Sequence, residues 1–198
     1  NNIPVSMLRV SNAAETRTML ALAGRERLMG IVEGLLEKGG MGAEKSLMII
    51  GFTGRRRLAA RVRSEAFAIL KANGGSSRGF GATALGRPFG GQWRKSRFRN
   101  PYLRNTLWGM GIAVDTLETA VNWASVPGTV AAIETALRDA LASFGERIHV
   151  FTHLSHFYPH GASIYTTYLF RLTSDPAETL HRWEALKGAG SRAVVAHG

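Results

Sequence analysis

The stretch RIHVFTHLSHFYPHGASIYTTYLFRL, from Arg147 to Leu172, decides how this chain of 198 residues is expected to fold. Its two arms, Arg147 to Phe157 and Ser163 to Leu172, are rich in β-branched and aromatic residues, which favour strands. The tetrad YPHG between the arms, from Tyr158 to Gly161, has the composition of a turn. We therefore predict an antiparallel hairpin with Tyr158 at its tip.

A helix is expected on each side of this hairpin. Upstream, a helix that begins at Ser125 or Thr129 has Gly145 as its C-terminal cap, and its apolar residues recur at helical spacing: Val130, Ile133, Leu137, Leu141 and Phe144. Downstream, Ser174, Asp175 and Pro176 begin a helix that carries Leu180, Trp183 and Leu186 on one stripe and continues towards Val194. Met110 to Val121 is expected to form a further strand.

The first part of the chain has a similar alternation. Met7 to Val10 predicts a short strand, and Asn12 with Glu15 forms a capping-box-like start of a helix. Leu47 to Phe52 predicts a buried strand, and Arg55 to Asn73 has the apolar spacing of a helix. Residues 74–92 are rich in glycine and are expected to form a loop. The order indicates an α+β fold of two halves, each laying helices on an antiparallel sheet.

Composition bounds the class of protein. The longest apolar runs are shorter than the roughly 18 to 20 residues that span a bilayer, and the first ten residues lack the basic and apolar regions of a signal peptide. The sequence has no cysteine, which excludes a disulfide framework and a thiolate nucleophile. A cytoplasmic protein fits these features, and a homodimer is compatible with them.

The net charge of +11 is concentrated in one region. Between Arg55 and Arg104 the only acidic residue is Glu65. The same segment holds thirteen of the 25 basic residues: Arg55, Arg56, Arg57, Arg61, Arg63, Lys71, Arg78, Arg87, Arg94, Lys95, Arg97, Arg99 and Arg104. The set is compatible with a solvated or covered surface, with a phosphate-bearing small molecule, or with a nucleic acid, because Trp93, Phe98 and Tyr102 interleave with the basic residues. Charge alone does not separate these interpretations.

Four of the six histidines lie close together in the sequence: His149, His153, His156 and His160. On a strand, His149 and His153 point to one face and His156 to the other, so one metal ion cannot easily gather them. We expect no metal site and structural roles for these histidines.

Other catalytic patterns are weak. Gly79 and Gly81 lack the third glycine and the preceding strand of a dinucleotide fingerprint, and there is neither a P-loop nor a G-x-S-x-G elbow. Asp115 and Glu118 on one strand would point to opposite faces and make a poor acid and base pair. Without further information the residues indicate an α+β domain with an anion-binding face.

Three short motifs carry a resemblance to a known family. They are Tyr102-Leu103-Arg104, then Glu118-Thr119 with Trp123 five residues after the glutamate, and Tyr158-x-x-Gly161-Ala162. With these motifs the chain resembles the C-terminal, substrate-covering cap of FAD-linked oxidases of the vanillyl-alcohol oxidase type, most closely the alkyldihydroxyacetonephosphate synthase branch. The similarity covers nearly the whole chain and implies a ferredoxin-like cap with FAD as cofactor.

The resemblance also implies roles for two residues. Arg104 is expected to bind the phosphate of a substrate, and Tyr158 is expected to be the acid/base residue. A phenol is a weak acid, so neighbours such as His156 or Arg104 would have to tune it for proton transfer. This interpretation requires Arg104 and Tyr158 to converge over the flavin ring.

The implied enzyme exchanges the acyl group of an acylated dihydroxyacetone phosphate for a fatty alcohol. Related caps serve FAD-dependent oxidoreductases that act on 2-hydroxy acids or alcohols, and a basic nucleic-acid-binding module or a protein-docking domain is the rival from another class. We expect a small phosphate-bearing or hydroxy-acid substrate and no nucleic acid. We also expect residues 1–198 to be a fragment without the upstream FAD-binding domain and the final histidine-rich segment, and inactive in isolation.

Overall fold

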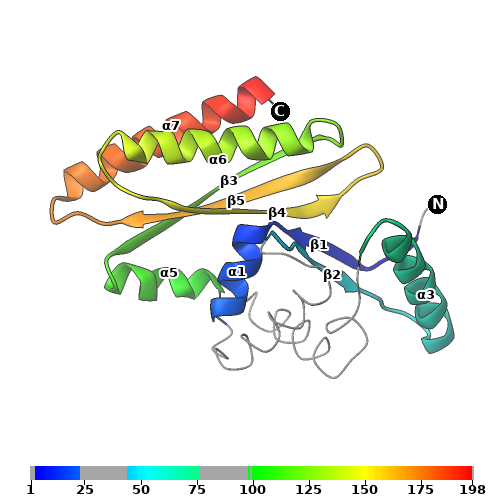
Figure 1. Cartoon of the computed structure of the whole chain (residues 1–198). Coiled ribbons are helices and arrows are strands. Elements are labelled where there is room, and N and C mark those ends of the chain that lie inside the picture. Colours follow the sequence, from blue (N-terminus) through cyan, green and yellow to red (C-terminus); the bar gives the residue numbers. More distant parts are fainter. Residues whose placement is uncertain (1–2, 23–43, 76–97, 99, 198) are drawn as a thin grey trace.

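The computed structural model describes residues 3–22, 44–75, 98 and 100–197. In chain order the elements are β1 (Met7–Ser11), α1 (Ala13–Leu22), β2 (Leu47–Gly51), α3 (Arg56–Ala72), α5 (Asn100–Gly109), β3 (Ile112–Asn122), α6 (Val126–Ala142), β4 (His149–Phe157), β5 (Gly161–Arg171) and α7 (Pro176–His197). Figure 1 shows α6 and α7 side by side on one face of the sheet, with α1 and α5 on the other face. The expected α+β class, an antiparallel sheet covered by helices, is confirmed. Among the described helices, none is long and apolar enough to cross a membrane.

The second half of the chain forms the predicted hairpin and its flanking helices. The strands β4 and β5 pair antiparallel, and β5 also pairs with β3 over its full length, from Ile112 opposite Arg171 to Asn122 opposite Gly161. The order strand, helix, strand, strand, helix, with both helices on one face, is the ferredoxin-like arrangement up to its second helix.

The hydrophobic core lies between this sheet and the helices α6 and α7. Leu117, Ile164 and Tyr168 point to it from the strands and are buried. The stripe predicted for α6 meets them with Ile133, Leu137 and Leu141, each at most 1% exposed, and α7 adds Leu186. Because burying such a side chain contributes roughly 1.5–3 kcal/mol, this layer is the main source of stability.

The ends of α6 and α7 follow the sequence signals in part. Gly145 follows α6 with φ 72°, a conformation that glycine adopts at no steric cost. Asp175 caps α7, because its Oδ1 accepts the N–H of Ala177 at 2.9 Å. Gly190 does not break α7. A Cβ atom at this position would lie 2.2 Å from Leu117 Cδ1, so the glycine lets α7 pack closely on β3.

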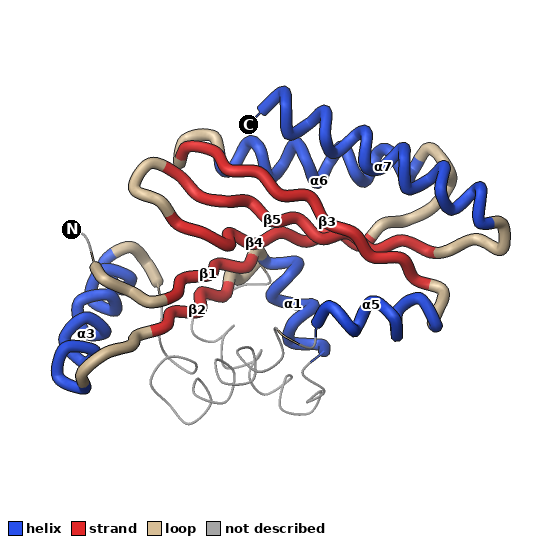
Figure 2. The backbone as a smooth tube through the Cα atoms, turned by 180° about the vertical axis from the view of Figure 1, so that it is seen from behind, coloured by secondary structure: helices blue, strands red, loops and turns tan. Residues whose placement is uncertain are grey.

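The first half does not form a sheet of its own. The strand β1 pairs with β2 on one side and with β4 on the other, so that one sheet has the order β2-β1-β4-β5-β3 (Figure 2). The pairing with β4 is short, with Val10 opposite Leu154 and Ser11 opposite His153. Our expectation of two separate sheets is therefore wrong. A two-stranded hairpin is marginally stable alone, and the free edge of β4 offers β1 a further partner.

The helix α5 was not predicted from the sequence. It begins at Asn100, with Pro101 in its first turn, where the missing backbone N–H has no intrahelical partner to lose. The expected loop at residues 74–92 lies, apart from Gly74 and Gly75, outside the described residues.

Candidate functional site

Tyr158 lies at the tip of the β4–β5 hairpin, as predicted. Its side chain is 50% exposed, and its backbone N–H donates to the carbonyl oxygen of Gly161 at 2.8 Å. The turn is tied to the end of β3 because the backbone N–H of Trp123 donates to the carbonyl oxygen of His160 at 3.1 Å. The hairpin and β3 therefore hold the backbone of Tyr158 while its phenol faces solvent.

The glycine after this turn is required by packing. A Cβ atom at Gly161 would lie 1.9 Å from the carbonyl oxygen of Val121, so only glycine lets β5 approach β3 here. Ala162 follows with no exposed surface. The Gly-Ala pair of the Tyr-x-x-Gly-Ala motif thus fixes the backbone that carries Tyr158.

A β-bulge lies just before the turn. The pairing of β4 with β5 shifts between Leu154 and Phe157, which places two residues, Ser155 and His156, opposite Ser163. The Ser155 hydroxyl lies 3.3 Å from Glu118 Oε1 and 3.1 Å from His156 Nδ1, and His156 Nδ1 lies 4.0 Å from Glu118 Oε1. We call Glu118, Ser155 and His156 the bulge cluster. It gathers an acid, a hydroxyl and an imidazole on the sheet face opposite α6 and α7, two residues from Tyr158.

The bulge corrects one sequence-based expectation. His156 was expected on the sheet face opposite His153. Glu118 and His153 are both in register with Tyr165, so they lie on the same face. The extra residue of the bulge turns His156 to this face, beside Glu118. Bulges are frequent next to active sites because they re-aim side chains in this way.

The remaining histidines of β4 have structural partners. His149 Nε2 lies 2.8 Å from the hydroxyl of Thr18, while burial and the charges of Arg17 and Arg138 lower the pKa of His149. His153 stacks on the ring of Tyr165 at 4.9 Å between ring centres. In the described ranges no three His, Cys, Asp or Glu side chains gather as metal ligands.

His153 belongs to a buried ionic triad with Arg9 and Glu15. Glu15 Oε1 accepts from Arg9 Nη2 at 2.5 Å and lies 3.1 Å from His153 Nδ1. Burial alone would raise the pKa of Glu15, but the hydrogen bond and charge of His153 and the charge of Arg9 outweigh burial and hold that pKa below its usual range. The expected capping bond is present as well, because the Glu15 N–H donates to Asn12 Oδ1 at 2.9 Å. The Glu15 side chain bonds the triad, whereas a full capping box would return it to the backbone.

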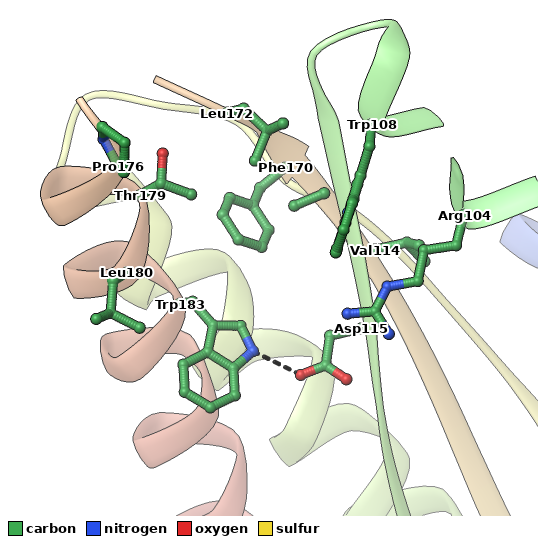
Figure 3. A pocket seen from close by; sticks show the side chains of 11 residues that line it. Arg104, Trp108, Val114, Asp115, Phe170, Leu172, Pro176, Thr179, Leu180 and Trp183 are labelled. Carbon is green, nitrogen blue, oxygen red and sulfur yellow. Dashed lines mark hydrogen bonds between the residues drawn. The ribbon is translucent and has the colours of Figure 1, made fainter. Parts of the chain in front are cut away.

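Arg104 lies on α5, at the far end of the sheet from the hairpin turn. Its guanidinium stands over the ring of Trp108, with 4.8 Å between Cζ and the ring centre. Both residues line a pocket of about 350 Å³ at the free edge of β3, between α5 and α7 (Figure 3). The walls of this pocket, which we call the edge pocket, are mainly apolar and include Phe170, Leu180 and Trp183.

Asp115 forms the polar part of the edge pocket. Its Oδ2 accepts from Trp183 Nε1 at 2.7 Å, Lys187 Nζ at 2.9 Å and the Tyr168 hydroxyl at 3.1 Å, and its Oδ1 accepts from the Thr116 N–H at 2.7 Å. Burial opposes ionisation of Asp115, but these donors, Lys187 first, outweigh it and lower the pKa of the carboxyl group. Asp115 is therefore a carboxylate whose oxygens already accept hydrogen bonds from neighbouring residues.

Residues 1–198 match the family described as FAD linked oxidases, C-terminal domain. The chain belongs to this family.

Curated and solved relatives agree with this assignment. The chain is 27% identical over 124 residues to the alkyldihydroxyacetonephosphate synthase of Trypanosoma brucei brucei and 30% identical over 126 residues to that of Dictyostelium discoideum. These alignments cover 63% and 60% of this chain but only 19% and 18% of the two relatives. The chain thus spans about a fifth of the length of the curated relatives it matches.

Solved structures show the fold of this FAD-linked oxidase domain. Two structures of an alkyldihydroxyacetonephosphate synthase, in space groups P212121 and P1, superpose with TM-scores of 0.75 and 0.76. Both are 22% identical to the chain, and the superpositions cover 96% and 99% of it and 34% of each structure.

The domain does not bring Arg104 and Tyr158 together. The edge pocket adjoins Asp115 near the start of β3, whereas the turn of Tyr158 adjoins Asn122 at its end. Seven strand residues at roughly 3.3 Å each separate these positions by about 23 Å. The shared hollow expected from the sequence is absent from the described part of the domain, so Arg104 is too far away to tune Tyr158.

The described residues do not fit an FAD site of their own. A pocket of about 350 Å³ suits a small molecule, whereas FAD has two ring systems joined by a pyrophosphate. The glycines with positive φ in these residues are Gly54, Gly74, Gly111 and Gly145, and they stand one to a turn, far apart in sequence. As a member of an FAD-linked family, this domain belongs to proteins that use the cofactor, but its described residues form no dinucleotide cradle.

Sequence reasoning named Asp115, Glu118 and His156 but predicted neither the donors around Asp115 nor the grouping of Glu118, Ser155 and His156 at the bulge. Asp115 lies two residues from each of the buried Ala113 and Leu117, so it shares their core-facing side of β3. A carboxylate in such a position needs hydrogen-bond donors, which is a signal the sequence contains. The bulge leaves no such signal, because it depends on how two strands pair. Of the basic region, residues 78 to 97 and Arg99 lie outside the described residues, while the arginines of α3 are exposed.

Proposed function

We propose that the chain is the substrate-covering cap of a longer FAD-dependent enzyme of the alkyldihydroxyacetonephosphate synthase type. Such an enzyme replaces the acyloxy group of an acylated dihydroxyacetone phosphate with the alkoxy group of a fatty alcohol and releases the fatty acid, without net redox change. The FAD-binding domain and a final histidine-rich segment would lie outside residues 1–198. The relatives named for this activity, together with the family match over the whole chain, support the proposal.

The observation that carries the proposal is the presentation of Tyr158. The phenol stands half exposed on a turn whose backbone is fixed by Gly161 and by the bond from Trp123 to His160. An acid/base residue needs this combination of a rigid backbone and an accessible hydroxyl. The bulge cluster supplies polar neighbours. Of the two groups expected to tune Tyr158, His156 is two residues away in the sequence, whereas Arg104 lies near the other end of β3.

An oxidoreductase acting on a 2-hydroxy acid or alcohol is the second candidate, because the matching family is described as oxidases. The two reactions differ in redox balance. An oxidation transfers a hydride from the substrate carbon to the cofactor, while the acyl-for-alkyl exchange leaves the substrate at the same oxidation level.

Two measurements test these assignments. In the full-length protein, anaerobic incubation with acyl dihydroxyacetone phosphate and a labelled fatty alcohol should yield a labelled ether with no lasting loss of flavin absorbance, and Tyr158→Phe should abolish it. Lasting bleaching by a 2-hydroxy acid, without ether formation, would select the oxidoreductase.

Titration of the 198-residue chain with FAD tests the domain boundary. We expect no stoichiometric binding and no shift of the flavin spectrum. Tight binding would show that this domain holds the cofactor by itself.

A further inference from the structure

The β-bulge in β4 decides to which face of the sheet Tyr158 points. Up to Leu154 the strands β4 and β5 pair in one register, and beyond the bulge Phe157 lies opposite the buried Ala162. Ala162 lies on the side of β5 whose residues are buried against α6 and α7. Successive pairs alternate between the two faces of a sheet. The next pair, in which the Tyr158 N–H donates to the carbonyl oxygen of Gly161, therefore faces away from α6 and α7, on the side of the bulge cluster.

A regular hairpin would place Tyr158 differently. If the earlier register continued without the extra residue, His156 would lie opposite Ala162 and would face the core. Phe157 would then lie opposite Gly161 on the outer face, and Tyr158 would leave the paired strands for a three-residue loop. A slip of one residue moves every side chain of a strand to the other face in this way. The bulge thus keeps Tyr158 in the last pair of the hairpin.

Two sets of contacts hold the bulged register. The ring of Phe157 packs on the ring of Trp123, with 5.8 Å between the ring centres. On the opposite face, Glu118 Oε1 accepts from the Ser155 hydroxyl at 3.3 Å and lies 4.0 Å from His156 Nδ1. Ser155 and His156 are the two residues of the bulge, so Glu118 contacts the bulge itself. These contacts exist only while both side chains lie on the face of Glu118.

The contact between Glu118 and the bulge crosses a whole strand. Glu118 belongs to β3, and β5 lies between β3 and β4. Two strand spacings amount to about 10 Å, so a side chain must be long to contribute to this bridge. The residue of β5 opposite the bulge is the small, buried Ser163, which leaves the path above it open. Glu118 therefore ties the outer strand β3 to the bulge in β4.

We propose that Glu118 is a positioning residue for Tyr158. Its carboxylate bridges β5 and holds Ser155 and His156 on one face, which maintains the register that keeps Tyr158 paired and directed away from α6 and α7. The bridge requires the length of glutamate and an acceptor oxygen. Its effect on catalysis rests on the proposed acid/base role of Tyr158, whereas its effect on the register does not.

Hydrogen exchange in the 198-residue chain, measured by NMR, tests the register without any reaction. The reporter is the Tyr158 N–H, which donates to Gly161. In Glu118→Asp the carboxylate is one carbon shorter, and this amide should exchange about fivefold faster, because a partly exposed hydrogen bond to a charged group is lost. Glu118→Gln keeps the length and an acceptor oxygen and should stay within about twofold of the unmodified chain. The amide of Tyr168, in the middle of β5, should not change.

Activity of the full-length protein tests the consequence for catalysis. Glu118→Asp should lower kcat for ether formation about fivefold and leave KM within about twofold, because the bridge acts through Tyr158 and not on bound substrate. Glu118→Gln should retain most of kcat. Glu65→Asp, the same change on the exposed surface of α3, should alter neither exchange at Tyr158 nor kcat.

Deletion of Ser155 supplies a rescue. It removes the extra residue, so that His156 pairs with Ser163 while Phe157 and Tyr158 keep their partners without a bulge. In this background Glu118→Asp should have no further effect on exchange at Tyr158 or on kcat, because two changes that act through one feature are not additive.

Three results would overturn the proposal. The first is equal exchange at Tyr158 in Glu118→Asp and Glu65→Asp. The second is an equal loss in Glu118→Asp and Glu118→Gln, which would assign the effect to charge and not to a bridge. The third is a further loss when Glu118→Asp is added to the Ser155 deletion. Full activity of Tyr158→Phe would instead refute the acid/base role, and exchange at Tyr158 would still decide the role of Glu118.

Discussion

At the scale of single residues, Gly161 shows how a motif position can be explained by packing. Gly161→Ala would force a methyl group against the carbonyl oxygen of Val121, a backbone atom that cannot rotate away. We expect a loss of about 3 kcal/mol or more in the free energy of unfolding. Denaturant unfolding of the chain measures it.

Gly128 supplies the control for this substitution. It lies in α6, and outside its own stretch of helix no atom stands within 4 Å of the place that the methyl carbon of an alanine would take, so Gly128→Ala should stabilise the chain by up to about 1 kcal/mol. Equal effects of the two alanine substitutions would contradict the close approach at Gly161.

Glu15 links stability to pH. Its pKa is lower in the folded chain than in the unfolded chain, so its contribution is fully present above the ordinary value of about 4.3 and is lost as the pH falls through the folded value. We expect the free energy of unfolding to fall as the pH is lowered from about 5 towards 3. Glu15→Gln should remove part of this dependence and cost about 3 kcal/mol at neutral pH, since Arg9 loses its buried partner.

The exposed Glu65 on α3 provides the comparison, because Glu65→Gln removes an acid that has no ion pair in the described structure. Urea unfolding of the three chains at several pH values distinguishes them. Parallel pH profiles for the Glu15→Gln variant and the unmodified chain would contradict a role for the triad.

At the scale of elements, local signals predicted well and pairing signals did not. The spacing of Ile133, Leu137 and Leu141 predicted α6, and the turn residues after Phe157 predicted the hairpin, because both depend on near neighbours in sequence. The bulge in β4 and the single sheet depend on which strand lies beside which, and no local pattern encodes that choice. The helix α5 was not predicted, because Tyr102-Leu103-Arg104 was considered only as a family motif and the segment around it was assigned no secondary structure.

The edge of β3 is closed by side chains at its middle. Lys187 Nζ donates to the carbonyl oxygen of Thr116 at 2.6 Å, and the N–H of Thr116 donates to Asp115 Oδ1. Both backbone groups of Thr116 are therefore occupied. Free edge groups pair readily with other chains. We expect Lys187→Met to lower the free energy of unfolding by about 1–2 kcal/mol and to increase self-association. Sedimentation velocity measures the second effect.

A lysine elsewhere separates edge protection from general charge. Lys71→Met removes the same charge from the end of α3 and should change neither stability nor association. If both variants associate equally, solubility depends on net charge, and Lys187 has no special effect at the edge.

At the scale of the whole molecule, the sheet runs through both halves of the chain, but the hydrophobic core packs against the strands of the second half. The core cluster of buried residues lies entirely between Ala113 and Leu186, whereas the first half contributes Val62 and Ala66 outside it. The two halves are joined by a short pairing of β1 with β4, by the Arg9–Glu15–His153 triad, and by hydrogen bonds such as those of Thr18 with His149 and of Asn12 with Glu134. The order of strands and helices in the sequence indicated two halves, although their strands share one sheet.

This uneven core predicts that the two halves open separately. Regions with few buried apolar contacts open at lower free energy than the global unfolding. Amide hydrogens of β1 and β2 should exchange faster than those of β3 and β5, and His153→Ala should speed exchange in β1 while β3 stays protected. Hydrogen exchange measured by mass spectrometry resolves these peptides. Leu137→Ala, in the core of the second half, should instead speed exchange in every strand, because β1 and β2 are not stable without the pairing of β1 with β4. Uniform acceleration by His153→Ala would show that the sheet unfolds as one cooperative unit and that the triad is not a seam.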